Sequence, residues 1–191
     1  MTTEQMQELS GMHLAPYIQV ATWLIGKSRE AGGNMFRHQL DTLSVLIDYK
    51  YIDSVLLKAS LVHDLLEDIP DFNHNILLSI DSESHAVYEL VLEVSRRHEE
   101  SKPDFLSRIK EKGSQNAKIL KVADRISNMI SLGFVNNIEF VERYIKETET
   151  YVLPIAKEIN NDMVIELTHL VESRKLFLDG YRCNLDLKLK L

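Results

Sequence analysis

Apolar residues recur along the chain at intervals of three and four, the period of an α-helix with one buried face. Ala123, Ile126 and Ile130 show this spacing. Glycine and proline, which interrupt helices, occur only seven and four times. The pattern predicts helices over residues 15–27, 37–49, 52–67, 84–97, 104–112, 115–132, 137–158 and 162–178. We therefore predict an all-α fold in which residues 1–183 form a single helical bundle.

The last eight residues have a different pattern. Residues 184–191, Asn-Leu-Asp-Leu-Lys-Leu-Lys-Leu, alternate strictly between polar and apolar side chains. This alternation predicts a short amphipathic strand at the C-terminus. Such a strand either pairs with a partner chain or lies frayed at an edge, so the pattern leaves a homo-oligomer open.

Length and charge narrow the classes of protein. A chain of 191 residues can bury a substantial core, and it contains no apolar run near the ~20 residues that span a bilayer. The N-terminus lacks the basic start and apolar centre of a signal peptide, and Cys183 is the lone cysteine. We expect a cytoplasmic protein without a membrane partner. The net charge of −7 argues against a nucleic-acid partner but is compatible with a small anionic substrate.

The stretch 61–69 places charged groups among leucines. If it is helical, His63 lies one turn before Glu67, and Asp64 lies one turn before Asp68. Burying these groups without partners would be costly, so a compensating ligand is expected. A divalent cation would compensate His63 and Asp64, and Glu67 and Asp68 would then lie where they can act on a water or a substrate oxygen. This arrangement predicts a metal-dependent hydrolase.

His38 and Asp124 also interrupt apolar stretches, and they complete a set of two imidazoles and two carboxylates. Such a set suits Mn, Fe, Zn or Mg and leaves positions open for water. The predicted ligands are His38, His63, Asp64 and Asp124. For Asp124 the alternative is a salt bridge with Lys121 or Arg125, of which Arg125 is the poorer partner because adjacent residues on a helix face different ways.

The order His38, His63-Asp64, Asp124 resembles the signature of the HD-domain phosphohydrolases. Further motifs resemble the hydrolase domain of the Rel/Spo alarmone hydrolases, including their stand-alone small forms, over roughly residues 15 to 160. The matching positions are Arg29, nine residues before His38; His63-Asp-x-x-Glu67-Asp68; Lys121-x-Ala-Asp124-Arg-x-x-Asn128-Met129; Ser131; and Glu147-Thr148…Tyr151…Pro154-x-Ala156.

The resemblance implies an HD-domain bundle that uses one divalent ion, preferably Mn²⁺, to remove the 3′-pyrophosphate of guanosine tetra- or pentaphosphate. The products would be GDP or GTP and pyrophosphate. Glu67 and Asp68 would be catalytic, Arg29 would meet phosphate or stack on the base, and Asn128 and Ser131 would bind ribose or phosphate. Lys146 and Tyr151 would form the pocket wall, although both also fit the ordinary face of an amphipathic helix.

One loop departs from the family pattern. Residues 29–39 read Arg-Glu-Ala-Gly-Gly-Asn-Met-Phe-Arg-His-Gln, without the Lys-Ser, the Pro-Tyr and the Pro after His that the family usually carries. We therefore expect guanine selectivity to be looser than the phosphate chemistry. Two alternatives stay open, an HD-type phosphatase or phosphodiesterase for another nucleotide and a non-catalytic nucleotide-sensing module. The intact Glu67-Asp68 pair argues against the second, since a binder gains nothing from extra carboxylates near phosphates.

Overall fold

The computed structural model describes residues 1–188, and residues 189–191 lie outside the described part. The helices are α1 (Thr3–Gly11), α2 (Ala15–Ala21), α3 (Met35–Asp48), α4 (Ser54–Ser60), α5 (Leu65–Asp68), α6 (His74–Leu78), α7 (Ser84–Val94), α8 (Lys102–Lys112), α9 (Gln115–Ser131), α10 (Ile138–Glu147), α11 (Leu153–Ile159) and α12 (Asn161–Lys188). Short 3₁₀ turns cover Thr22–Leu24 and Leu132–Phe134, and a π-helical turn covers Thr148–Val152. Residues 1–188 contain no strand, so the predicted all-α class is confirmed.

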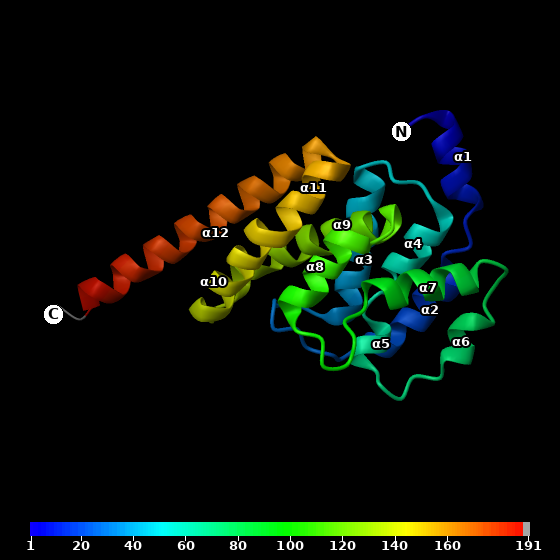
Figure 1. The fold of residues 1–191 in the computed structure, drawn as a ribbon, viewed down its shortest axis with the longest axis horizontal. Helices are drawn as coiled ribbons and strands as arrows, with labels where there is room; N and C mark the ends of the chain where they lie inside the picture. The colour runs from blue at the N-terminus through cyan, green and yellow to red at the C-terminus, as the bar shows by residue number, and fades with distance from the viewer. Residues whose placement is uncertain (189–191) are drawn as a thin grey trace.

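Helix α9 is the centre of the bundle. It contacts α3, α4, α7, α8, α11 and α12, and most of its side chains from Ala117 to Met129 are buried. Figure 1 shows α10, α11 and the long α12 on one side of α3 and α9, with α2, α4, α6 and α7 on the other. A helix buried on nearly all sides gives its polar residues no access to solvent. Each buried polar residue of α9 therefore needs a partner inside the fold.

Capping residues fix where several helices begin. The side chains of Asp53, Ser101, Ser114 and Asn137 accept hydrogen bonds from backbone N–H groups in the first turns of α4, α8, α9 and α10. These caps satisfy donors that have no partner within the helix. The residue at which each of these four helices begins is thus fixed by its own N-terminal sequence.

The predicted helix 52–67 is interrupted. Helix α4 ends at Ser60, and a turn over 61–64 precedes α5. In this turn the amide of Leu65 donates to the carbonyl of Val62 at 3.0 Å, a tighter pattern than that of an α-helix. Nδ1 of His63 lies 2.7 Å from the carbonyl oxygen of Ser60, the acceptor that the amide of Asp64 would use in a continuous helix. The imidazole thus replaces a helical hydrogen bond, and His63 and Asp64 project from a turn.

Other boundaries also differ from the prediction. The helices α1 and α6 were not predicted, and the predicted helix 137–158 is divided by the π-helical turn into α10 and α11. The predicted C-terminal strand is wrong for residues 184–188, because α12 continues through Lys188. Extending an existing helix is easier than starting a new element, and residues 1–188 offer no strand to pair with. The rest of the predicted strand, 189–191, lies outside the described residues.

Among the residues that the structure describes, no helix is both long enough and apolar enough to cross a membrane.

Candidate functional site

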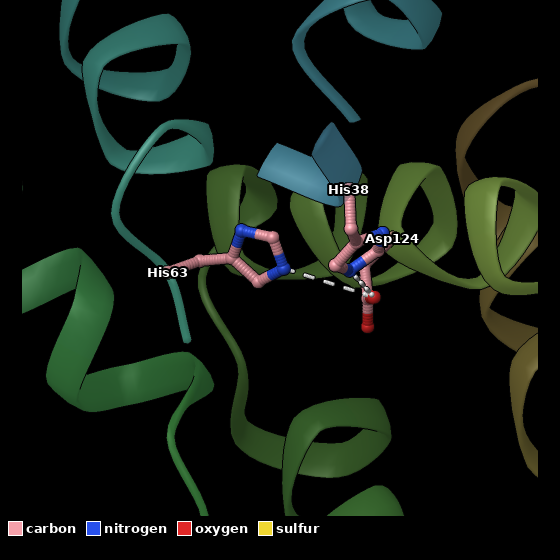
Figure 2. Close-up of side chains that lie close together, drawn as sticks. All are labelled: His38, His63 and Asp124. Carbon is pink, nitrogen blue, oxygen red and sulfur yellow. Dashed lines mark ion pairs between the residues drawn. The ribbon is translucent and has the colours of Figure 1, made fainter. Parts of the chain in front are cut away.

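Three of the predicted ligands meet in the interior. His38 lies near the start of α3, His63 lies in the turn before α5, and Asp124 lies in the middle of α9. One ligand atom from each lies within 4.8 Å of the other two, and all three residues are buried. Figure 2 shows the two imidazoles converging on the carboxylate from separate elements. Residues far apart in the sequence thus form one cluster, which indicates a site for a divalent metal.

Asp64 adjoins this cluster. Its Oδ2 lies 3.4 Å from Nε2 of His38 and 3.2 Å from Nε2 of His63. On the other side, Oδ1 of Asp124 lies 3.0 Å from Nε2 of His38 and 3.7 Å from Nε2 of His63. The structure therefore brings all four predicted ligands together, while their role as ligands stays a prediction.

Hydrogen bonds to neighbouring groups orient both imidazoles. Nδ1 of His63 donates to the carbonyl of Ser60, because a carbonyl oxygen can only accept, so Nε2 carries the lone pair when the ring is neutral. Nδ1 of His38 lies 2.8 Å from Oγ of Ser127. Nε2 of His63 is buried and makes no hydrogen bond within the described residues. Although it makes no such hydrogen bond, this atom lies between the carboxylates of Asp64 and Asp124. The arrangement fits a metal ion, because ligating histidines are held through their other nitrogen.

The charges of the cluster are strongly coupled. Burial lowers the pKa of His38, so its imidazole is neutral and able to ligate. Burial also disfavours the charged form of His63, but the carboxylates of Asp64 and Asp124 outweigh it and raise the pKa of His63 to about 9. Burial opposes ionisation of Asp124, yet Lys121 and the two imidazoles hold the pKa of Asp124 well below its usual range. The buried carboxylate of Asp124 and the partly buried one of Asp64 thus call for positive charge, which a proton on His63 or a cation can supply.

Lys121 contacts the outer side of the cluster. Its Nζ donates to Oδ2 of Asp124 at 2.7 Å, and both side chains are buried. The salt bridge considered for Asp124 is therefore present with Lys121, and it occupies one carboxylate oxygen. Oδ1, the other oxygen, faces the imidazoles. The salt bridge and a ligand role are thus compatible.

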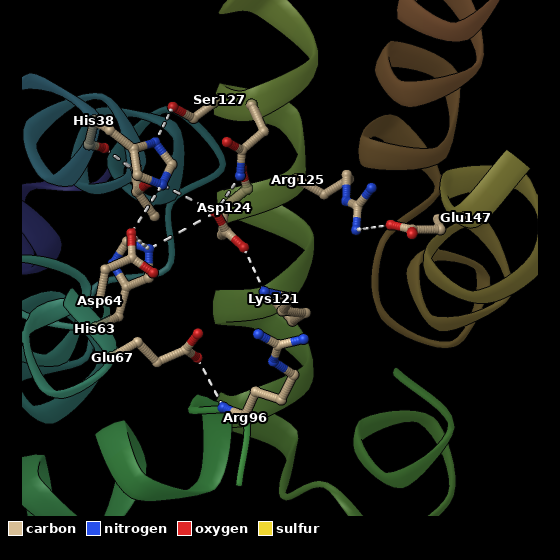
Figure 3. Close-up of polar contacts among 12 residues, drawn as sticks. His38, His63, Asp64, Glu67, Arg96, Lys121, Asp124, Arg125, Ser127 and Glu147 are labelled. Carbon is tan, nitrogen blue, oxygen red and sulfur yellow. Dashed lines mark hydrogen bonds and ion pairs between the residues drawn. The ribbon is translucent and has the colours of Figure 1, made fainter. Parts of the chain in front are cut away.

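The predicted catalytic pair lies beside the cluster in α5. Glu67 is exposed, and its Oε1 accepts a hydrogen bond of 2.7 Å from the backbone amide of Arg96 (Figure 3). Asp68 is half-buried, and burial together with the negative charges of Asp64 and Glu67 raises the pKa of Asp68 to about 6. A carboxyl with its pKa near neutrality is suited to exchanging a proton, as Asp68 would. Glu67, in contrast, is held by its hydrogen bond to the segment after α7.

Arg29 and Asn128 are brought together at the end of α9. Nη2 of Arg29 donates to Oδ1 of Asn128, whose Nδ2 donates to the backbone carbonyl of Asp124 at 3.0 Å. The loop with Arg29 packs on Ser131 through Gly32, which has a φ of +84°. A Cβ at Gly32 would lie 3.2 Å from the carbonyl oxygen of Ser131, so this approach requires glycine. Oγ of Ser131 donates to the carbonyl of Ser127.

A cleft of about 660 Å³ opens between α10, the π-helical turn, and the segment that joins α7 to α8. Lys146 and Tyr151, both predicted from the sequence, line it. It also contains Arg96, Lys102 and Arg143, which were not among the predicted site residues. Burial and the positive charges of Lys121 and Arg125 lower the pKa of Lys102 to about 8. The four basic side chains outnumber the carboxylates of Glu30 and Glu147 that also line the cleft, which favours an anionic ligand.

No family model matches the chain. The probable guanosine-3′,5′-bis(diphosphate) 3′-pyrophosphohydrolase of Mycoplasma genitalium is 28% identical to it in an alignment 158 residues long, which covers 75% of this chain. The match covers 21% of that protein, so the chain spans about a fifth of this relative's length.

The fold is similar to that of a solved structure, a metazoan ortholog of SpoT that is described as hydrolysing ppGpp and acting in starvation responses. It is similar to this chain with a TM-score of 0.70, 21% sequence identity, and coverage of 84% of this chain and 94% of that chain. The two proteins share one fold.

Within that fold, sequence reasoning identified the cluster better than the cleft. The additional cleft residues Arg96, Lys102 and Arg143 lie at exposed or half-exposed positions. Arg96 belongs to the Arg-Arg-His run 96–98, which reads most simply as a solvated surface. The signal that could have identified these residues is the concentration of basic residues in 96–102 together with the i, i+3 pair Arg143 and Lys146.

Proposed function

We propose that the protein is a metal-dependent hydrolase that releases pyrophosphate from the 3′ position of guanosine tetra- and pentaphosphate, leaving GDP or GTP. The observation that carries this proposal is the convergence of His38, His63, Asp64 and Asp124, with Nε2 of His63 buried and without a hydrogen-bond partner among the described residues. The named relatives support it, since both are described by their action on this nucleotide.

The four residues would hold one divalent cation, and we propose Mn²⁺. Two imidazole nitrogens and two carboxylate oxygens are compatible with this ion. When bound, it would supply Lewis-acid activation of water and of a phosphoryl oxygen. Ser60, Ser127 and Lys121 would keep the ligands in place through the hydrogen bonds described above.

The reaction adds water across one P–O bond. Oxygen from water bonds to the phosphorus attached to the ribose, the bond from that phosphorus to the 3′ oxygen breaks, and the 3′ oxygen takes up a proton. Asp68, with its raised pKa, would accept the proton that the water loses. Glu67 would position the water or assist the leaving oxygen, while its Oε1 holds the amide of Arg96.

Substrate would bind along the line from Arg29 to the cleft. Arg29 and Asn128 would contact the nucleoside or its adjoining phosphate, with Ser131 nearby on α9. The cleft would take phosphate charge through Lys146 and the further basic side chains, and Tyr151 would form part of its wall. The altered loop 29–39 leads us to propose that an adenosine analogue is also accepted.

The direct test is a nucleotide panel assayed with Mn²⁺, in which released pyrophosphate and orthophosphate are counted separately. We expect pyrophosphate from the 3′-pyrophosphorylated guanosine nucleotides and none from a 5′-monophosphate. Efficient cleavage of a 5′-monophosphate or a cyclic dinucleotide, without pyrophosphate from the guanosine compounds, would contradict the proposal. Binding of the guanosine compounds without any turnover would favour a sensing module.

A further inference from the structure

Two consecutive residues of α9 point in opposite directions. Asp124 faces the imidazoles, whereas Arg125 extends from the other side of the helix towards Glu147 (Figure 3). Arg125 is only 1% exposed, although it carries a permanent charge. Burying a guanidinium is costly, and an apolar residue of similar size often serves stability as well. The position of Arg125 therefore calls for an explanation beyond packing.

Within the described residues, the side-chain hydrogen bonds and the ion pair of Arg125 are with the segment that forms the cleft wall. Its Nη1 donates to Oγ1 of Thr148 at 3.2 Å and to the carbonyl of Tyr144 at 3.4 Å. Its Nη2 lies 3.7 Å from Oε2 of Glu147, and its guanidinium carbon lies 3.9 Å from the centre of the Tyr144 ring. Tyr144 and Glu147 line the cleft. The guanidinium thus connects the helix of the metal cluster to the surface that faces the substrate.

The same contacts coincide with the π-helical turn. The carbonyl of Tyr144 accepts from Oγ1 of Thr148 at 2.7 Å as well as from Arg125, just where α10 gives way to the wider turn. Side chains that enter the hydrogen-bond ladder of a helix are a known cause of such distortions. The turn carries Thr150 and Tyr151, and both line the cleft. The path from Arg125 through Thr148 therefore ends at the cleft wall.

We propose that Arg125 is a positioning residue, which sets the wall formed by Tyr144, Glu147 and Tyr151 relative to the cluster at Asp124. The inference rests on the proposed function, because it assigns the cleft to the substrate of that reaction. Arg125 touches neither the cluster nor the substrate. Its loss should displace the wall and weaken substrate binding, while the metal site and the chemical step remain.

The experiment compares Arg125→Met and Arg125→Lys with the wild type, using guanosine tetraphosphate and Mn²⁺. For Arg125→Met we expect KM to rise roughly 10-fold to 100-fold, the scale of a displaced positioning element, with kcat and metal content within about twofold of wild type. Arg125→Lys keeps a donor for Thr148 and should rescue part of the change. Thr148→Val removes the same contact from the other side and should raise KM less, which tests the path if Arg125→Met fails to fold.

The matched control is Lys58→Met. Lys58 is also a buried cation, 4% exposed, and its ion pairs are with Asp81 and Glu83, away from the cleft wall. The Lys58→Met variant should have a lower melting temperature than the wild type and an unchanged KM. An unchanged KM in Arg125→Met, or a fall in kcat with loss of metal, would overturn the proposal.

If the wild type releases no pyrophosphate, the proposed function fails on its own. Hydrogen exchange of the amides of residues 144–152 then decides about Arg125. Faster exchange there in Arg125→Met but not in Lys58→Met would support the positioning role, and equal exchange in the two variants would overturn it.

Discussion

At the cluster around Asp124, the imidazoles of His38 and His63 are buried and each is oriented by a hydrogen bond, whereas the basic side chains of the cleft extend from exposed or half-exposed positions. Buried groups of this kind hold their atoms in a narrow range of positions, as metal coordination requires. Long cationic side chains near solvent supply charge but adapt their geometry to what they bind. Changes in the cluster should therefore remove chemistry, and changes near the cleft should remove affinity.

The largest effect should come from Asp64→Ala. Removing one carboxylate takes away a proposed ligand, and with it the several kcal/mol of transition-state stabilisation that a cation supplies, so turnover should fall by roughly 10³-fold or more. Elemental analysis measures the metal content, and pyrophosphate release measures the turnover. Asp41→Ala, which removes an exposed carboxylate on α3, serves as control and should change neither. Equal metal content in Asp64→Ala and wild type would refute the assignment.

Asp68→Asn and Glu67→Gln should separate chemistry from metal binding. Each removes a proposed acid–base group, so kcat should fall roughly 10²-fold or more while the metal content stays at the wild-type level. Glu67→Gln retains an acceptor for the amide of Arg96, so its fold should remain intact. Asp71→Asn, in the loop after α5, is the control. Full activity of either variant, or loss of its metal, would mean that the role is wrong.

Arg29→Ala and Asn128→Ala should act on affinity. Each loses a proposed charged or buried hydrogen bond to the substrate, which corresponds to about 1–3 kcal/mol of binding free energy. Because Arg29 donates to Asn128, the double variant should lose less than the sum of the two. Titration of guanosine tetraphosphate measures these losses, with the exposed Arg37→Ala as control. Strict additivity, or a loss confined to kcat, would contradict shared substrate contacts.

The smallest effect should be the acid limb of the pH profile. The pKa of Asp68 is raised to about 6, and a base must be ionised, so kcat/KM should fall about tenfold per pH unit once the pH drops below that pKa. A bound cation favours the carboxylate, so the limb of the metal-loaded enzyme should lie at or below pH 6. Asp68→Asn should abolish this limb. A profile that keeps the same limb in that variant would exclude Asp68 as the titrating group.

The sequence predicted the long helices and the cluster because both depend on strong local signals. Helix α9 has a buried apolar face, and α3 packs partly buried apolar residues against the core, so a polar residue in an apolar stretch of either helix is conspicuous in the sequence. Helix α1 was missed because none of its residues is buried, so it has no apolar face to create a period. The break at 61–64 was missed because it depends on the imidazole of His63 meeting the carbonyl of Ser60, a contact that periodicity does not represent.

The cleft was harder to predict than the cluster for a physical reason. A buried charge must be compensated, so His63 and Asp64 call for an explanation even in the sequence. An exposed lysine or arginine has the same pattern whether it faces bulk solvent or lines a binding surface. Arg143 and Lys146 fall on the polar face of α10 in either case. Only the fold shows that Arg96 and Lys102 lie along the same cleft as these two residues.

The contact of Gly32 with the carbonyl of Ser131 has a consequence for how this protein can be altered. With a φ of +84° and a Cβ that would lie only 3.2 Å from the carbonyl oxygen of Ser131, position 32 favours glycine and anchors the loop on α9. Gly33 is exposed but also has a positive φ, +80°, so it too favours glycine, whereas Glu30 is exposed and has no such constraint. Sequences grafted around these two retained glycines should therefore change which nucleobase is accepted, while the residues on α9 keep their places.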